Sequence, residues 1–134
     1  MLYLVPVGRF LYSAIFLMTV MGHFSAGYIA YAAQAGVPAP GLLVPLSGVI
    51  ATLGGLSVTL GYKAKIGAWL LVLFLVPVTL KMHNFWAVTD PMMHGMQMAM
   101  FMKNVSMLGA ALLITHFGAG PLSLDARRAS TPPA

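Results

Sequence analysis

Four long apolar stretches, separated by short polar joints, make up most of this 134-residue sequence. Each stretch is nearly free of charge and has the roughly 17 to 25 residues that a helix needs to cross the hydrocarbon core of a bilayer. Backbone amides in lipid must be satisfied within their own segment, so each stretch is expected to be helical. The sequence therefore predicts an all-α fold, an integral membrane four-helix bundle that forms a single domain.

Turn-forming residues set the limits of the predicted helices. The helices are expected at about residues 10–33, 42–60, 66–86 and 96–117. Prolines and glycines in 36–41 end the first, and a basic turn at 61–65 separates the second from the third. Residues 118–134 are rich in Ser, Thr and Pro and form a polar tail that we expect to fray.

The composition excludes several classes of protein. The chain is 60% hydrophobic and 7% charged, and it contains no cysteine, which excludes disulfides, thiolate catalysis and cysteine-ligated metal clusters. Its net charge of +5 comes from scattered basic residues, so we predict no nucleic-acid partner and a lipid bilayer as the surroundings. Asp90 and Asp125 are the only acids, which disfavours a hydrolase or a proton relay.

Basic residues also predict the orientation in the membrane. Four crossings place five of them on one side: Arg9, Lys63, Lys65, Arg127 and Arg128. The positive-inside rule then predicts that both termini are cytoplasmic and that residues 34–41 and 82–95 face outward. The first helix is expected to remain as a signal anchor. A cleaved signal peptide has a basic segment before its apolar run and a cleavage site after it, and neither is seen around this helix.

His23 and Lys103 are ionisable residues well inside the predicted spans, where a charge is costly. His23 lies about midway along the first predicted helix, where its imidazole could bind a quinone oxygen, a haem iron or another helix. A simple hydrogen bond to a neighbouring hydroxyl is the alternative. Lys103, next to Asn104, lies about two turns into the fourth helix, where it either has a function or extends its ammonium outward to water.

A polar segment joins the third and fourth predicted helices. It brings a base, an acid, imidazoles and an aromatic ring together at the outer end: Lys81, His83, Asn84, Trp86, Asp90 and His94. Such a place suits a polar headgroup, a quinone ring or a partner subunit. A solvated loop with one weak surface ion pair is the alternative.

Methionine is concentrated at the start of the fourth predicted helix. Six methionines fall within residues 92–102, and Met92, Met96 and Met100 would share one helix face. Thioethers are ligands for Cu(I), which makes copper an alternative, although methionine also fills irregular apolar interfaces. We favour packing and predict no metal site.

Small residues predict how the helices pack, because close backbone approach drives association in lipid. Residues 47, 51, 55 and 59 of the second helix are Ser, Ala, Gly and Thr, a stripe that recurs every four positions. A similar pattern on the first helix, at Gly22, Ala26 and Ala30, is expected to meet this stripe.

Several short motifs, taken in order, resemble the DoxX family. They are Gly8-Arg9, Gly36-Val37-Pro38, Gly54-Gly55, His83-Asn84-Phe85-Trp86, Lys103-Asn104 and Gly120-Pro121-Leu122-Ser123-Leu124-Asp125. The resemblance implies a bacterial inner-membrane protein associated with a redox complex. It also implies that His83, Lys103 and Asn104 are site residues. Ala51 stands where family members often carry a Glu.

These observations lead to two functional hypotheses. The first is a small subunit of a redox complex that binds quinone through His23, His83, Trp86, Lys103 and Asn104. In it, His83 exchanges a proton with the quinone, Lys103 stabilises negative charge and Trp86 covers the ring. The second is a non-catalytic subunit that packs against other membrane or redox subunits. A Cu(I)-binding membrane protein is a third, less favoured alternative, and whether the chain is an enzyme stays open.

Overall fold

The computed structural model describes residues 2–130, and within them the chain forms helices and turns but no strand. Four helical segments are long and apolar enough to cross a membrane: Leu4–Phe24, Pro40–Leu60, Ala64–Ala87 and Pro91–Phe117. The predicted all-α fold with four membrane-spanning helices is thereby confirmed.

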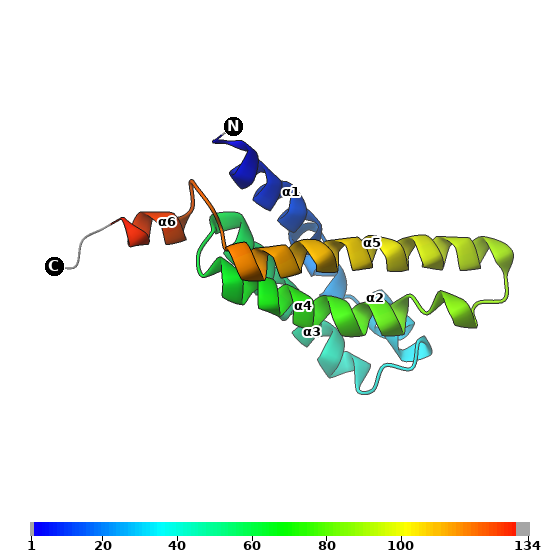
Figure 1. The fold of residues 1–134 in the computed structure, drawn as a ribbon. Helices are drawn as coiled ribbons and strands as arrows, with labels where there is room; N and C mark the ends of the chain where they lie inside the picture. Colours follow the sequence, from blue (N-terminus) through cyan, green and yellow to red (C-terminus); the bar gives the residue numbers. More distant parts are fainter. Residues whose placement is uncertain (1, 131–134) are drawn as a thin grey trace.

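The elements follow one another as helices joined by short turns. They are α1 (Leu4–Met18), the 3-10 helix η1 (Val20–Phe24), α2 (Ala26–Gln34), α3 (Pro40–Leu60), α4 (Ala64–Met82), the 3-10 helix η2 (Phe85–Ala87), α5 (Pro91–Phe117) and α6 (Leu124–Ala129). Helix α3 packs against α1 and α4, and α5 packs against α4 (Figure 1). The start of α1, the α3–α4 turn and α6 all lie at one end of the bundle.

The first predicted helix begins earlier than expected and is broken in the middle. It starts at Leu4 and ends at Met18, where the Thr19 hydroxyl donates to the Ile15 carbonyl at 2.9 Å. Ser25 has an extended backbone and accepts from the Tyr28 amide at 3.3 Å, so it is the N-cap of the separate helix α2. His23 therefore lies at the far end of the first span rather than midway along it.

The last spanning helix also begins earlier than predicted. Asp90 accepts a hydrogen bond from the Met93 amide at 2.8 Å, and Pro91 occupies the first helical position. An acidic N-cap followed by proline is a strong helix start, so α5 begins at 91 and not near 96. The methionine-rich segment is consequently helical throughout.

Helix α3 uses its small residues on two sides. A Cβ atom added to Gly48 would lie 2.5 Å from the His23 Cβ, and one added to Gly55 would lie 3.3 Å from the Phe16 Cβ. On the other side, a Cβ on Gly54 would lie 2.9 Å from the carbonyl oxygen of Gly67 in α4. The stripe thus faces the first span as predicted from its spacing, but its partners there are Phe16 and His23, because the break after Met18 disrupts the expected repeat.

The segment after α5 is folded as far as residue 130, instead of fraying. The Arg9 guanidinium, 6% exposed, donates to the carbonyls of Ala119, Pro121 and Leu122, the last at 2.7 Å. The Asp125 carboxylate accepts from the backbone amides of residues 63 and 64 at 2.7 and 3.0 Å, which caps the start of α4. Two charged side chains thus hold this segment, here called the C-terminal strap (118–130), against the bundle.

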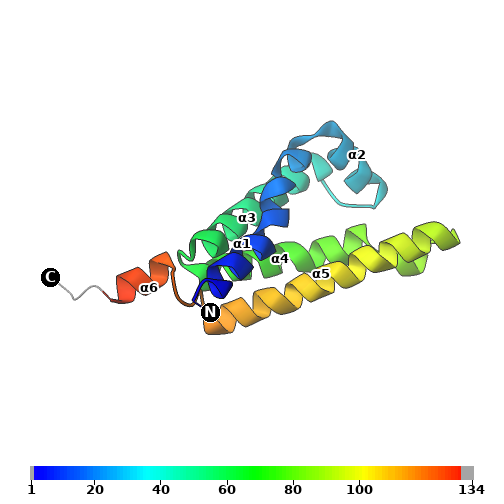
Figure 2. The ribbon, with the colours of Figure 1, turned by 90° about the horizontal axis from the view of Figure 1, so that it is seen from above.

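The spanning helices form two pairs that diverge. Helices α1 and α3 lie together, as do α4 and α5, and Figure 2 shows the two pairs meeting near α6 and separating toward the end that carries α2. The buried apolar core lies where the pairs meet and includes Phe16, Val58, Leu71 and Leu75. The divergence leaves space between the pairs at the opposite end, where the outward-facing loops are expected.

Candidate functional site

A large cleft occupies the space between the two helix pairs. Its volume is about 710 Å³, and residues from α1, η1, α2, α3, α4 and α5 line it. Most of the lining is aliphatic or aromatic, including Ile15, Phe16, Ile50 and Phe74. The polar side chains of the lining are Thr19, His23, Tyr28, Tyr31, Ser47, Lys81, His83, Lys103 and Asn104. A mostly apolar cavity with a few polar groups is typical of a ligand site.

Four of the five side chains predicted as site residues line this cleft. His23 comes from η1, His83 follows the end of α4, and Lys103 and Asn104 lie on α5. Trp86 is the exception, because η2 directs it against Phe85 and Phe101, with ring centroids 5.3 and 5.8 Å apart. Trp86 is 58% exposed and does not line the cleft, so it cannot cover a ligand ring there.

Aromatic rings and a backbone carbonyl fix the orientation of His23. Its ring lies 5.9 Å from that of Tyr28 and 5.7 Å from that of Phe74. Its Nδ1 lies 3.0 Å from the Thr19 carbonyl oxygen. A carbonyl can only accept, so Nδ1 carries the hydrogen and Nε2 of the neutral ring is left as an acceptor. His23 is 9% exposed. Its Nδ1 has a hydrogen-bond partner, so Nε2 is the ring nitrogen left for a group in the cleft.

A chain of hydrogen bonds crosses one end of the cleft. The His83 Nδ1 lies 2.8 Å from the Gln97 Oε1, and the Gln97 Nε2 donates to the Tyr31 hydroxyl at 3.1 Å. These three residues belong to the end of α4, to α5 and to α2. The chain therefore joins the α2 arm to the α4–α5 pair. Sequence reasoning missed Gln97, although an amide inside a run of methionines is a signal of such a bond.

Replacement of Gln97 by leucine is expected to release the α2 arm from α5. Interhelical hydrogen bonds in membranes contribute about 0.6 to 2 kcal/mol, enough to shift a local equilibrium severalfold. The chain has no cysteine, so Ala33→Cys and Met93→Cys supply a unique pair of spin-label sites. Double electron–electron resonance should then show a broader distribution of label-to-label distances in Gln97→Leu, with a longer mean distance.

Ser106→Ala is the matched control for this measurement. The Ser106 hydroxyl donates to the Met102 carbonyl within its own helix, at 3.0 Å, so its loss should leave the distribution unchanged. An unaltered distribution in Gln97→Leu would show that the α2 arm is held by apolar packing alone.

Lys103 and Asn104 provide polar groups deep in the membrane region. Asn104 is 4% exposed, and among the described residues its side-chain amide has no hydrogen-bond partner. Lys103 is exposed, and within residues 2–130 its ammonium donates one hydrogen bond, to the Met100 sulfur at 3.6 Å, which is a weak acceptor. Both side chains line the cleft and have unused hydrogen-bonding capacity for a ligand there.

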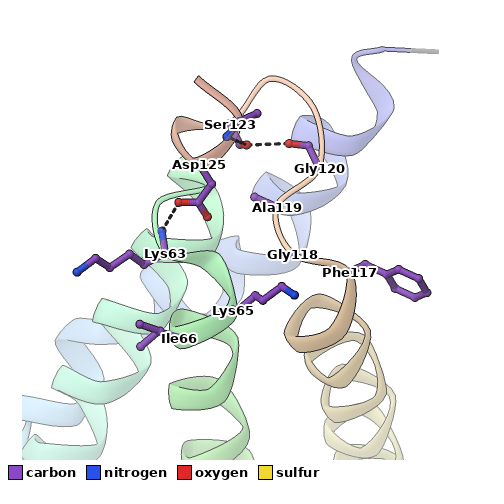
Figure 3. Close-up of a pocket in the computed structure, with 10 residues that line it drawn as sticks. Lys63, Lys65, Ile66, Phe117, Gly118, Ala119, Gly120, Ser123 and Asp125 are labelled. Carbon is purple, nitrogen blue, oxygen red and sulfur yellow. Dashed lines mark hydrogen bonds between the residues drawn. The ribbon is translucent and has the colours of Figure 1, made fainter. Parts of the chain in front are cut away.

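A second, smaller cavity of about 620 Å³ lies at the opposite end of the bundle (Figure 3). The C-terminal strap and the start of α4 line it, including Lys63, Lys65, Gly118, Ser123 and Asp125. Its polar groups are largely engaged in holding the strap: Ser123 donates to the Gly120 carbonyl at 2.7 Å, and Asp125 caps α4. This cavity is accounted for by the architecture of the strap.

The described residues contain no group of three or more His, Cys, Asp or Glu side chains that could hold a metal ion. On α5, Met92, Met96 and Met100 are 78%, 51% and 37% exposed, so the methionine face points toward the surroundings of the bundle. That position suits contact with lipid or with another protein, and the Cu(I) alternative stays a sequence-based prediction.

Comparison with known proteins gives one family and two relatives. The model of the SURF4 family matches residues 43–130. The inner membrane protein YphA of Escherichia coli (strain K12) is 30% identical over 101 residues, which cover 75% of this chain and 71% of that protein. The ER-derived vesicles protein ERV29 of Saccharomyces cerevisiae is 32% identical over 68 residues, which cover 51% of this chain and only 22% of ERV29. No solved structure matches.

The family match overturns the resemblance to the DoxX family, and that prediction is wrong. The motifs behind it were short, and the structure gives several of them general structural roles. Arg9 holds the strap, Gly54 allows α3 to approach α4, and Asp125 caps a helix. Such roles recur in small membrane bundles, so these motifs did not discriminate between families. The names of the two relatives state a membrane or vesicle location and no redox activity.

Proposed function

Because this chain belongs to the SURF4 family of membrane proteins, we propose that it acts as a multi-pass membrane protein that binds a lipid-soluble molecule in the cleft between its two helix pairs. The observation that carries the proposal is the convergence of His23, His83, Lys103 and Asn104 on one cavity of about 710 Å³. These residues come from three separate segments of the chain and line the same cavity, although each is costly to place in lipid.

The lining indicates what kind of molecule fits. Aromatic and aliphatic side chains would hold an apolar body, while the Lys103 ammonium and the Asn104 amide would donate hydrogen bonds to a polar head. The volume falls within the range of about 300 to 1,000 Å³ that small-molecule sites occupy. An amphiphile with hydrogen-bond acceptors at one end therefore fits the cleft best.

A quinone is one such molecule, and a quinone ligand would give the protein a role in a redox complex. His83 would exchange a proton with a quinone oxygen, and Lys103 would stabilise the negative charge of the reduced ring. Both side chains line the cleft, which supports this version, whereas the position of Trp86 does not. Chromatography of an organic extract of the purified protein tests it: a stoichiometric quinone supports the redox role, and its absence removes it.

Blocking the cleft should abolish ligand uptake. Ile50 lies on α3 and lines the cavity, so Ile50→Trp would place a bulky indole where the apolar body of the ligand belongs. We expect uptake of a fluorescent acyl amphiphile by the purified protein to fall at least tenfold, by a loss of about 1.4 kcal/mol or more of binding free energy. Titration in neutral detergent measures this change.

Leu53→Trp is the matched control for the blocked variant. Leu53 lies on the same helix, is 55% exposed and does not line the cleft, so the same indole there should leave uptake intact. Equal uptake by wild type and Ile50→Trp would mean that the amphiphile binds elsewhere, and the proposed function would then fail.

A second role, as a packing or assembly subunit, is favoured by the surface of α5. That helix of 27 residues buries only Asn104 and Ala111. Its exposed methionines form an adaptable apolar face, of the kind that suits a protein neighbour. Purification in mild detergent distinguishes the roles, since a stable partner of defined stoichiometry supports assembly and an isolated chain that retains amphiphile supports the binding role.

The location of the protein is proposed on the same basis. We propose the inner membrane of a bacterium, with both termini in the cytoplasm. The similarity to an inner membrane protein of Escherichia coli supports this membrane as the location. The orientation is supported by the basic residues, which lie at the end of the bundle that carries α6.

A further inference from the structure

We infer that the polar head bound in this cleft is an anion, a carboxylate or a phosphate carried on an acyl chain. The inference rests on the proposed function and names the chemical class of its ligand. The observations that carry it are the charges of the lining, the use made of both acidic side chains, and an amide that opens onto the cleft without a hydrogen-bond partner among the described residues.

The charged side chains of the cleft all have the same sign. Lys81 and Lys103 line it, and the lining residues include no carboxylate. Lys103 lies near the middle of the 27-residue α5 and is exposed, so in a membrane its ammonium would lie at a depth where a lone charge is costly. Its hydrogen bond to the Met100 sulfur offsets little of that cost. In the described part of the chain, the Lys81 ammonium donates to the Gly36 carbonyl oxygen, at 3.5 Å.

The two acidic side chains of the protein are engaged elsewhere. Asp90 caps the start of α5 through the Met93 amide, at 2.8 Å. Asp125 caps the start of α4 through the amides of Lys63 and Ala64, at 2.7 and 3.0 Å. Each lies at an end of the bundle, so neither supplies the counter-charge for Lys103. The described residues place no acidic side chain in the cleft, so a bound ligand would bring the negative charge there.

Asn104 is the second group that points to an anion. Its side chain lines the cleft, is 4% exposed and lacks a hydrogen-bond partner among the residues that the structure describes. The amide opens onto the cleft, where an oxygen of the ligand could accept a hydrogen bond from its NH2 group. Neighbouring residues of a helix point in different directions, but Lys103 and Asn104 both line this cleft, so a ligand there is within the surroundings of an ammonium and of an amide donor.

The pairing of an ammonium with an amide donor in one cleft discriminates between an anionic ligand and a neutral one. A carboxylate or phosphate would satisfy the amide and neutralise the ammonium together, whereas a quinone or an ester would satisfy the amide but leave the charge unmatched. Charge-assisted hydrogen bonds are about twice as strong as neutral ones, so the anion should be preferred at least tenfold.

Binding of four probes with chains of the same length tests the inference. They are oleate, oleyl phosphate, methyl oleate and an octadecyl benzoquinone, each titrated against the full chain in neutral detergent. We expect oleate or oleyl phosphate to bind at least tenfold more tightly than both neutral probes, and the better of the two identifies the head group. Lys103→Met should remove this preference by weakening the binding of the anionic probe at least tenfold more than the binding of methyl oleate.

Two further variants sharpen the result. Lys103→Arg keeps the charge and should keep the preference, and Lys65→Met removes a cation at the other end of the bundle and should have no effect on it. Equal binding of anionic and neutral probes, or an unchanged preference in Lys103→Met, would overturn the inference and leave the proposed function standing. If none of the probes binds, the proposed function itself falls.

Discussion

Gly54→Leu is expected to prevent α3 and α4 from packing and to leave the protein unable to form its bundle. A Cβ atom on Gly54 would lie 2.9 Å from the Gly67 carbonyl oxygen, which belongs to the backbone and cannot turn aside. The same Cβ would lie 2.8 Å from the Leu71 side chain, one of the fully buried residues of the core. Close backbone approach is the main source of attraction between helices in lipid, so separating them removes that attraction.

The expected loss is about 3 kcal/mol or more, the upper end of the range for overpacked sites. Thermal unfolding in detergent, followed by size-exclusion chromatography, measures it. Gly109→Leu is the matched control, because a Cβ there meets nothing within 4 Å and the residue is exposed on α5. A Gly54→Leu protein as stable as Gly109→Leu would show that the two helices can separate without penalty.

Arg9→Met is expected to release the C-terminal strap and to destabilise the bundle by about 3 kcal/mol, because buried acceptors that lose a charged donor are left unpaired. The guanidinium is 6% exposed and donates to three carbonyls in 119–122. Without it, Asp125 would no longer be held beside the start of α4, so that helix would also lose its cap. Limited proteolysis should then cut within residues 118–130, which the intact protein protects.

Arg128→Met provides the comparison for this variant. Arg128 lies on α6 with its guanidinium 4.8 Å from the Tyr62 ring centre, an exposed contact of small value. Its loss should change neither the midpoint of unfolding nor the cleavage pattern. If Arg9→Met were equally resistant to protease, the strap would have to be held by apolar contacts rather than by the buried guanidinium.

The number and type of the spanning helices could be predicted from the sequence, because apolar length alone determines them in lipid. The boundaries could not. Apolar residues run through 10–33 without interruption, and the break after Met18 depends on the Thr19 and Ser25 side chains bonding to nearby backbone. The strap resembled a disordered tail because its order depends on Arg9, more than a hundred residues away in sequence.

Four of the five residues proposed for the site line one cleft, but the shape of that cleft could not be predicted. His23 and Lys103 were chosen because ionisable groups in lipid are costly. His83 was chosen from the polar segment between two helices, and the resemblance to the DoxX family added weight to His83, Lys103 and Asn104. Trp86 was included for its position in the sequence, and only the turn of η2 shows that it faces Phe101 instead. Gln97 gains its role from Tyr31 on α2, a neighbour that no local pattern reveals.

The link between Arg9 and residues 119–122 also bears on how the protein is made. A chain that emerges from the ribosome inserts its first helix long before the acceptors of that guanidinium exist. Until those acceptors arrive, the guanidinium of a nascent chain lacks the partners that bury it in the finished fold. A product that stops short of residue 119 would therefore leave the first helix without its tie to the end of the chain.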